Sequence, residues 1–257
     1  MAILRIDNIR KAFGGVVALN GCSFDVKDNS ITGLIGPNGS GKTSLFNVIT
    51  GFYRADDGVI YFKDREITRL RPYEIAQEGI VRTFQITRVF SGMTVMENML
   101  YAPKQQLGES FLRALFQIGP IRKQEEVNRQ KAMELLELVG LDELHREYAA
   151  NLSYGQKKLL ELGRSLLTSP ELIMLDEPAA GINPTMINKM KKVILDLHRE
   201  GKTFLIIEHD MQFVMSICEN VFVLDFGAKI SEGPPEFVQK DKNVVKAYLG
   251  TTYDFGN

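Results

Sequence analysis

The sequence predicts an α/β protein, and three observations support this prediction. A glycine-rich loop joins an apolar strand to a helix in the first fifth of the chain. Short segments on both sides of this unit alternate apolar and polar residues, as half-buried strands do. A stretch in the middle of the chain instead repeats its apolar residues at helical spacing. These patterns indicate a core of strands and helices that carries an inserted helical subdomain.

The composition is that of an ordinary globular protein. The 257 residues allow one large domain or two small ones, and 44% of them are hydrophobic and 25% charged. A net charge of -1 argues against a strongly basic nucleic-acid-binding surface, and the two cysteines, Cys22 and Cys218, imply no disulfide framework. No apolar run approaches the roughly 18 residues of a membrane span, and the N-terminus alternates like a strand rather than a signal peptide. We therefore expect a cytoplasmic protein that acts on a membrane only through a partner.

The N-terminal third is predicted to be rich in strands. Alternation predicts strands at Leu4–Ile9 and Ser23–Val26, and Phe13, Gly14 and Gly15 form a turn between them. Three further elements follow, a strand, a short helix and a strand, at Gly58–Phe62, Pro72–Glu78 and Ile80–Phe84.

The helical insert extends from about Thr94 to Thr168. Glycine and proline break it at Gly108, Gly119-Pro120 and Gly140, and it closes with an apolar-striped helix over Lys158–Leu167. Beyond it, strands and helices alternate again, and Asn183 before Pro184 is a plausible helix cap. These later elements are predicted at Leu172–Leu175, Pro184–Arg199, Thr203–Ile207, Asn220–Asp225, Lys229–Gly233, Glu236–Gln239 and Asn243–Leu249, with a turn at Gly227.

The glycine-rich loop fits a phosphate-binding pattern. Residues Gly36 to Thr43 have the spacing Gly, four residues, Gly-Lys-Thr, between a strand at Ser30–Ile35 and a helix at Gly41–Thr50. Such a turn directs several backbone N–H groups and the positive end of the helix dipole toward one anion. Lys42 is then predicted to bridge the β- and γ-phosphates, and Thr43 to ligate Mg²⁺ through its hydroxyl.

Polar residues follow three of the predicted strands. Asp176 and Glu177 end the apolar strand at Leu172–Leu175, where Asp176 is predicted to hold Mg²⁺ and Glu177 to accept a proton from an attacking water. His209, after another strand, either donates to the γ-phosphate or is a structural histidine. Gln85 either reaches Mg²⁺ or the attacking water, or is a polar residue leaving a strand.

A second helix start resembles an anion site. Ser153 lies in the segment Leu152 to Gln156, ahead of the last helix of the insert. In one interpretation Ser153 is a simple helix cap. In the other it presents its hydroxyl and the amides of the helix end to a phosphate, which suggests a nucleotide approached from two sides.

Taken together, these residues resemble the ATP-binding cassette (ABC) ATPase family, and the motifs follow the family's order from Phe13 to His209. The resemblance implies a P-loop NTPase core of the RecA-like type, an antiparallel β subdomain and a helical subdomain, with the core and β subdomain at roughly 1–93 and 169–257 and the helical subdomain at roughly 94–168. It implies Phe13 as the aromatic that stacks on adenine and Leu152 to Gln156 as the signature motif.

The resemblance also implies site residues. The implied nucleotide-binding residues are Phe13, Ala18, Asn38, Gly39, Ser40, Gly41, Lys42, Thr43, Ser44, Ser153, Gly155 and Gln156. The implied catalytic residues are Glu177, His209, Lys42 and Gln85, and the implied Mg²⁺ ligands are Thr43, Gln85 and Asp176.

Two positions depart from the usual pattern of the family. Tyr154 occupies a signature position that is usually glycine, and Asn183 ends a loop that usually contains aspartate. With the segments Arg82 to Gln85 and Glu208 to Met211, they are similar to the ATPase subunits of branched-chain amino-acid importers. Urea importers and lipopolysaccharide exporters have close relatives of these subunits, so the solute stays open here.

The resemblance also implies partners and a mechanism. Two cassettes, identical or different, would pack head to tail, with each ATP between the phosphate loop of one and Ser153 of the other. The pair would then push on transmembrane permease subunits at the cytoplasmic face of the membrane. The surface around Gln85 and the insert would meet the permease, and the apolar stretch Phe111 to Ile121 is either subdomain core or part of that surface. A soluble cassette ATPase is a second possibility, against which the single phosphate loop and the lack of heptads or basic tracts argue. A non-catalytic nucleotide sensor is a third, against which Glu177 and His209 argue.

Overall fold

The computed structural model of the chain describes residues 1–83, 86–102 and 118–249. The chain forms two compact units. The first comprises Met1–Arg82, Glu171–Ala179 and the residues from Leu195 onward, and the second comprises Thr83–Pro170 and Ala180–Ile194. None of the helices in the described ranges has both the length and the apolar character that crossing a bilayer requires.

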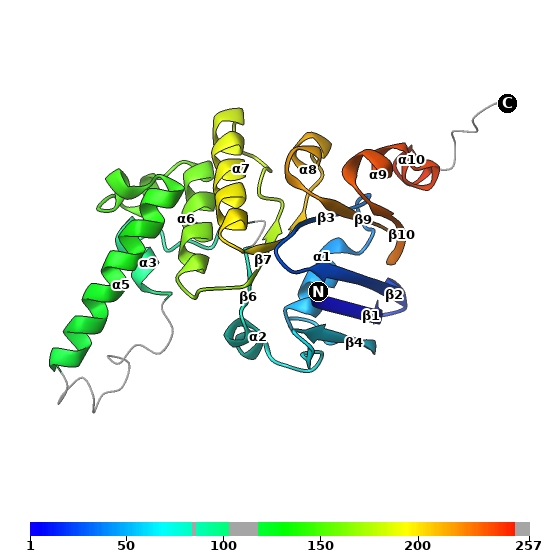
Figure 1. Ribbon diagram of the computed structural model, residues 1–257, viewed down its shortest axis with the longest axis horizontal. Helices are drawn as coiled ribbons and strands as arrows, with labels where there is room; N and C mark the ends of the chain where they lie inside the picture. The colour runs from blue at the N-terminus through cyan, green and yellow to red at the C-terminus, as the bar shows by residue number, and fades with distance from the viewer. Residues whose placement is uncertain (84–85, 103–117, 250–257) are drawn as a thin grey trace. The chain divides into compact units, whose positions relative to one another are not determined.

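The first unit is built on a six-stranded sheet (Figure 1). In sequence order its strands are β3 (Ile31–Ile35), β6 (Ile80–Arg82), β7 (Leu172–Asp176), β8 (Thr203–Ile207), β9 (Asn220–Asp225) and β10 (Ala228–Gly233). Their spatial order is β10-β9-β3-β8-β7-β6, and every neighbouring pair is parallel except β10 and β9. All residues of β3, β7 and β8 are buried, as expected for central strands of a parallel sheet that is covered on both faces.

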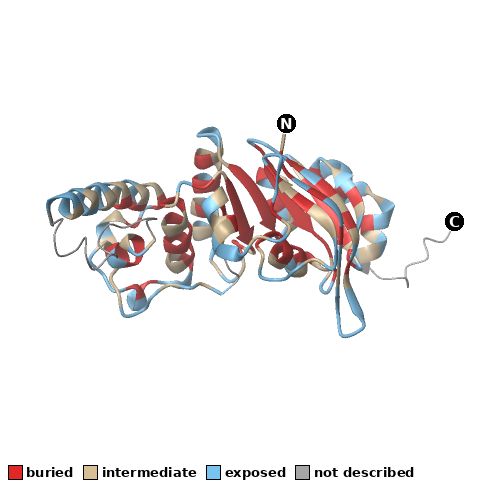
Figure 2. Cartoon of the chain, turned by 90° about the horizontal axis from the view of Figure 1, so that it is seen from below, coloured by how far each residue is buried: buried red, intermediate tan, exposed pale blue. Residues whose placement is uncertain are grey.

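A four-stranded antiparallel sheet completes the β structure of this unit. Its strands are β1 (Ala2–Phe13), β2 (Val16–Lys27), β4 (Asp57–Phe62) and β5 (Arg65–Glu66), in the order β2-β1-β4-β5. Apolar residues of both sheets and of the helix α1 (Lys42–Ile49) form one buried cluster, which includes Ile6, Phe24, Leu34, Phe46 and Phe222. Figure 2 shows the buried strands side by side. The helix that follows the glycine-rich loop is therefore held by the core on its apolar face.

Among the described residues, the first unit also contains short helices besides α1. They are α2 (Pro72–Glu78), α8 (Met211–Ile217), α9 (Pro235–Lys240) and α10 (Lys242–Leu249).

The second unit is helical. It contains α3 (Val95–Leu100), α5 (Ile118–Val139), α6 (Tyr154–Leu166), the short 3-10 turns Asp142–Leu144 and Ala149–Asn151, and the start of α7 (Pro184–Arg199), which ends in the first unit. Ala132, Leu136 and Val139 of α5 are fully buried. A Cβ at Gly163 of α6 would lie 3.5 Å from Val139 of α5, an ordinary van der Waals distance, so the two helices pack against each other at this point.

The structure confirms most of the predicted elements and the α/β core with its antiparallel and helical parts. The short helix at Pro72–Glu78 and the strands at Thr203–Ile207 and Asn220–Asp225 have the predicted bounds. Asn183 caps α7, since its Oδ1 accepts a hydrogen bond from the Met186 N–H at 2.9 Å.

The bounds of three elements, β1, β2 and α6, were predicted wrongly, each for a local reason. Strands β1 and β2 extend well beyond Leu4–Ile9 and Ser23–Val26, because the missed residues 10–13 and 16–18 include no buried side chain and so carry no apolar–polar alternation. Helix α6 begins at Tyr154 rather than Lys158, because Ser153 caps it. Gly119 and Pro120 lie in the first described turn of α5, a position where proline is tolerated, and the residues before Ile118 lie outside the described ranges.

Candidate active site

The glycine-rich loop joins β3 to α1 in a tight turn. Gly41 precedes the first helical residue, Lys42, with φ +104°, and the Ser40 N–H donates to the Pro37 carbonyl at 3.2 Å. Gly39 has φ +82° and is exposed. The amides at the start of α1 have no partner inside the helix, so the loop and the helix end offer N–H donors to an anion.

The outer side of this loop is fixed by the chain around it. The Gly227 N–H, in the turn between β9 and β10, donates to the Ser40 carbonyl at 2.9 Å. A Cβ at Gly36 would lie 2.1 Å from the Leu224 carbonyl oxygen, and one at Gly41 would lie 2.4 Å from that of Ala18. Ala18 was predicted to contact the nucleotide, and the structure places its carbonyl against the end of the loop.

Gly41→Ala is expected to lower the free energy of unfolding by about 2 kcal/mol or more, because the new methyl group meets the Ala18 carbonyl at a strained φ. Gly39→Ala is the matched control, since Gly39 also has positive φ but no atom within 4 Å of the new methyl group; we expect a loss of about 1 kcal/mol there. Urea unfolding without nucleotide measures both. Equal losses would show that the contact with Ala18 is unimportant.

Lys42 lies folded onto the loop. Its Nζ donates to the carbonyls of Gly36 and Pro37, both at 2.9 Å, and reaches Ser40 Oγ at 3.4 Å. Burial lowers the pKa of Lys42, and the carboxylates of Glu177 and Asp176 oppose this shift. The ammonium group and the two acids therefore belong to one electrostatic cluster. Thr43, next along α1, is exposed and Ser44 half-buried.

The two acids end β7, as predicted. Asp176 is buried, whereas Glu177 is only partly covered and its backbone N–H donates to the Ile207 carbonyl at 2.9 Å. Glu177 has φ +51°, a left-handed conformation that costs a residue with a side chain about 1 kcal/mol. This backbone bend turns the chain immediately after the strand.

His209 and Glu177 contact each other directly. His209 Nε2 lies 2.8 Å from Glu177 Oε1, and these side chains are 39% and 17% exposed. The neighbouring Glu208, which the sequence analysis did not single out, is buried; its Oε1 accepts from the Ala179 N–H at 2.6 Å and its Oε2 from the His209 N–H at 3.0 Å. Glu208 thereby ties the segment after Glu177 to the segment that carries His209.

Phe13 lies at the end of β1, where its ring is 40% exposed. It packs edge to face on Tyr53, with ring centroids 5.0 Å apart, and Lys11 Nζ lies 5.2 Å from its centroid. Tyr53 was not predicted, since nothing in the sequence links it to Phe13. The exposed ring is available for stacking.

The signature segment lies in the second unit and forms the start of α6. Ser153 Oγ accepts from the Gln156 N–H at 3.3 Å, and Gln156 Oε1 accepts from the Ser153 N–H at 2.8 Å. These two side chains thus form a reciprocal cap, so the simpler interpretation of Ser153 is correct as far as the single chain is concerned. A Cβ at Gly155 would lie 3.0 Å from Met186, and Tyr154 is 41% exposed.

Other predicted positions cannot be placed. Gln85 lies outside the described residues, as do Phe111 to Gln117 of the apolar stretch Phe111 to Ile121.

An ion pair that was not predicted involves Arg82, the last residue of β6, whose Nη2 lies 2.7 Å from Asp176 Oδ2.

The residues present fit Mg²⁺ better than a metal held by protein ligands alone. Among the residues that the structure describes, no group of three or more His, Cys, Asp or Glu side chains could hold a metal ion. The predicted ligands Thr43 and Asp176 offer a hydroxyl and a carboxylate oxygen. Mg²⁺ is usually bound by one or two carboxylates together with substrate phosphates and water, which matches so small a set.

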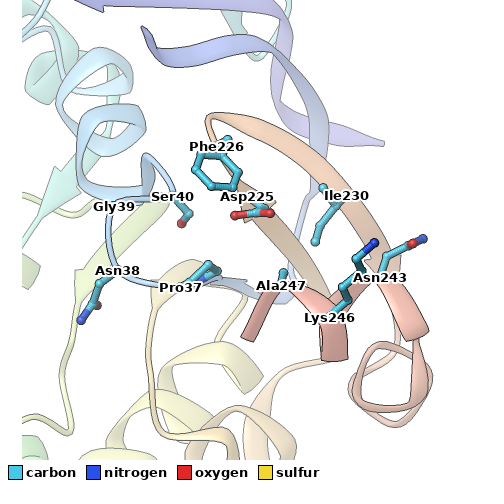
Figure 3. Close-up of a pocket in the computed structure, with 10 residues that line it drawn as sticks. All are labelled: Pro37, Asn38, Gly39, Ser40, Asp225, Phe226, Ile230, Asn243, Lys246 and Ala247. Atoms are coloured by element: carbon cyan, nitrogen blue, oxygen red, sulfur yellow. The ribbon is translucent and has the colours of Figure 1, made fainter. Parts of the chain in front are cut away.

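A cavity of about 670 Å³ lies on the outer side of the loop (Figure 3). Residues 37–40 form one wall, the turn after β9 another, and α10 the third, through Asn243, Lys246 and Ala247. Tyr248 of α10 accepts a hydrogen bond from the Gly36 N–H, and burial raises the pKa of its hydroxyl while this bond lowers it. The last described helix therefore touches the loop directly.

Comparison with known proteins gives consistent matches. The family described as "ABC transporter" matches residues 19–180, and that described as "Branched-chain amino acid ATP-binding cassette transporter" matches residues 228–254. The high-affinity branched-chain amino acid transport ATP-binding protein BraF of Pseudomonas aeruginosa is 42% identical over 249 residues, which are 96% of this chain and 98% of that protein. The corresponding LivG protein of Escherichia coli is 39% identical with the same coverage.

Solved structures agree with these matches. A nucleotide-free ATP-binding cassette from an ABC transporter superposes with a TM-score of 0.84 at 42% identity, covering 97% of this chain and 100% of the other. The ADP conformation of an ATP-binding cassette of an ABC transporter gives the same TM-score and identity, with 97% and 99% coverage.

Proposed function

Because this chain belongs to the ABC transporter family, as an ATP-hydrolysing subunit of the branched-chain amino-acid type, we propose that it works at the cytoplasmic face of the membrane and powers import through transmembrane permease subunits. The observation that carries the choice of solute is the match of residues 228–254 to the branched-chain amino-acid family, since this segment lies outside the shared ATPase motifs. The names of the relatives, which are 39 to 42% identical, point the same way.

We further propose how the first unit binds ATP. The amides of Asn38 to Ser44 surround the triphosphate, Lys42 turns from the loop carbonyls to the β- and γ-phosphates, and Phe13 stacks on adenine beside Ala18. Thr43, Asp176 and Gln85 are the proposed ligands of Mg²⁺, which when bound neutralises phosphate charge. Support comes from the position of Lys42, which is within hydrogen-bond distance of three loop oxygens and close to two acids.

Glu177 is the proposed general base. Its partly covered carboxylate accepts a proton from the attacking water, and the water oxygen attacks the γ-phosphorus as the bond to ADP breaks. His209, 2.8 Å from Glu177, holds that carboxylate and then donates to a γ-phosphate oxygen. Gln85 would position the same water. The bend at Glu177 and the bonds of Glu208 support this assignment, because they restrict where the carboxylate and the imidazole point.

The second ATP contact is proposed to come from another cassette, identical or different. The start of α6 offers helix-end amides together with Ser153, Gly155 and Gln156. Two such ends neutralise a triphosphate only when ATP lies between two chains, so ATP would hold the pair together and its cleavage would release it.

The permease is proposed to dock on the second unit. A cavity of about 620 Å³ is lined there by Arg88, Val89, Phe90, Tyr101, Ala102 and Arg164. The rings of Phe90 and Tyr101 pack at 4.7 Å yet are 38% and 63% exposed, and Arg164 lies over Phe90 at 5.5 Å. Exposed aromatic and arginine side chains around a hollow are typical of interface anchors.

Two experiments test the function. In proteoliposomes with the permease and its solute receptor, we expect ATP-dependent uptake of leucine, isoleucine or valine, whereas uptake of urea alone would contradict the proposed solute.

Tyr101→Glu is expected to weaken association with the permease by about tenfold or more. Tyr148→Glu is the matched control, since Tyr148 is similarly exposed, at 55%, but does not line the cavity. Equal effects of the two variants would exclude this docking surface.

A further inference from the structure

The buried ion pair between Arg82 and Asp176 is the feature of the first unit that the proposed function does not use. Arg82 Nη2 and Asp176 Oδ2 lie 2.7 Å apart, and each side chain is only 5% exposed. The two residues are 94 positions apart in sequence and meet because β6 and β7 are neighbouring parallel strands. Arg82 pairs in register with Met174, two residues before Asp176.

Two further contacts hold the guanidinium in place. Its Nη1 donates to Asn47 Oδ1 on α1 at 2.6 Å, and it lies 5.4 Å from the centroid of the Phe46 ring. Both partners belong to the helix that follows the phosphate loop. Arg82 therefore connects the carboxylate at the end of β7 with the loop helix. It is also the last residue of the first segment of the first unit, since Thr83 begins the second unit and Gln85 follows two residues later.

The charges suggest what this connection does. A buried carboxylate without a cation nearby is strongly unfavourable, and removal of one partner of a buried pair leaves such a charge behind. Arg82 supplies a cation in direct contact with Asp176 without help from any ligand, and Lys42 adds a second positive charge to the same electrostatic cluster. A divalent ion at the same carboxylate would repel the guanidinium and compete with it for the negative charge.

We propose that Arg82 is a positioning residue that acts as the built-in counter-ion of Asp176 and competes with the metal of the metal–nucleotide for that carboxylate. The proposal rests on the proposed role of Asp176 in metal binding. In the chain without ligand, Arg82 orients Asp176 and stabilises it. When Mg²⁺ and nucleotide bind, the metal shares the negative charge of the Asp176 carboxylate. The ion pair that holds Arg82, at the end of β6, then weakens. In the sequence, this end of β6 leads to Gln85.

The first test measures stability without any nucleotide. Arg82→Gln is expected to lower the free energy of unfolding, and Asp176→Asn in the same chain is expected to restore most of it, because the neutral amide no longer needs a cation. Arg82→Lys, which keeps the charge, should lose less than Arg82→Gln. Failure of Asp176→Asn to restore Arg82→Gln would overturn the counter-ion role, and this cycle does not depend on any activity of the protein.

The second test measures metal binding, with Mn²⁺ and ADP as the probes and Mn²⁺ detected by electron paramagnetic resonance. Arg82→Gln is expected to lower the Mn²⁺ concentration for half-saturation by a factor of about 2 to 150, the range for two coupled groups in contact. Arg82→Lys should leave it nearly unchanged. If Arg82 had only a structural role, Arg82→Gln and Arg82→Lys would leave the affinity for Mn²⁺ unchanged or weaken it. Either result for Arg82→Gln would overturn the proposed competition. If the unaltered protein bound no Mn²⁺ with ADP, the metal site of the proposed function would be wrong, and so would the competition inferred from it. The counter-ion role of Arg82 would still be decided by the stability measurements.

Discussion

Glu177→Gln is expected to reduce steady-state ATP hydrolysis by about 10²- to 10⁴-fold, the contribution of a general base, while ATP still binds. The amide has nearly the shape of the carboxylate but cannot take the proton of the attacking water. Because the backbone at Glu177 stays in the same left-handed conformation, the fold should be unaffected. In the presence of ATP the variant should accumulate as a lasting dimer, since the γ-phosphate that is proposed to join the two chains is no longer removed.

Phosphate release and light scattering measure these two outcomes. Glu171→Gln is the matched control. Glu171 lies just before the first residue of β7, at the other end of the strand from Glu177, and pairs with Lys63 at the surface. That variant should hydrolyse ATP at the normal rate. If Glu177→Gln kept more than a tenth of the normal turnover, another group would have to be the base.

Ser153→Asp is expected to abolish ATP-dependent dimerisation and to leave the fold intact. Aspartate is as good a helix cap as serine, so the bond from the Gln156 N–H is kept and the stability of α6 should change by no more than about 0.5 kcal/mol. The added negative charge, however, would face the triphosphate of the partner cassette. The variant therefore separates the two roles of Ser153, the cap seen within one chain and the phosphate contact proposed across two.

The dimer is best measured by light scattering with ATP in the Glu177→Gln background, where hydrolysis does not dissolve it. Ser153→Ala is the complementary control: it loses the cap, at a cost of about 1 kcal/mol, but adds no charge and should still dimerise. ATP binding to the monomer should be unchanged in both. A normal ATP-dependent dimer of Ser153→Asp would mean that the start of α6 does not contact phosphate.

The local elements of this protein could be predicted from sequence because each carries its own signal. The phosphate loop has a fixed spacing, β7 and β8 are short apolar runs that end in polar residues, and α7 begins with a cap and a proline. These same signals located the acids Asp176 and Glu177 and the imidazole of His209, and the structure places His209 in contact with the Glu177 carboxylate.

What the sequence could not predict depends on contacts between distant segments. The Arg82 ion pair joins residues 94 positions apart, and Glu208 holds Ala179 from 29 positions away. Nor does any pattern indicate that Tyr53 packs on Phe13, or that β1 continues through residues 10–13, none of which is buried. Strand register and side-chain packing determine these contacts, and a single sequence carries neither.

The left-handed backbone of Glu177 has a consequence for gene duplication. A glutamate is less stable than glycine or asparagine in that conformation, so selection for folding alone does not keep it there. A duplicated copy that is released from the need to cleave ATP would gain stability by losing this side chain, and position 177 would then be among the first to drift. If Glu177 is the general base, as proposed, folding favours its loss, and selection for ATP turnover is needed continuously to preserve it.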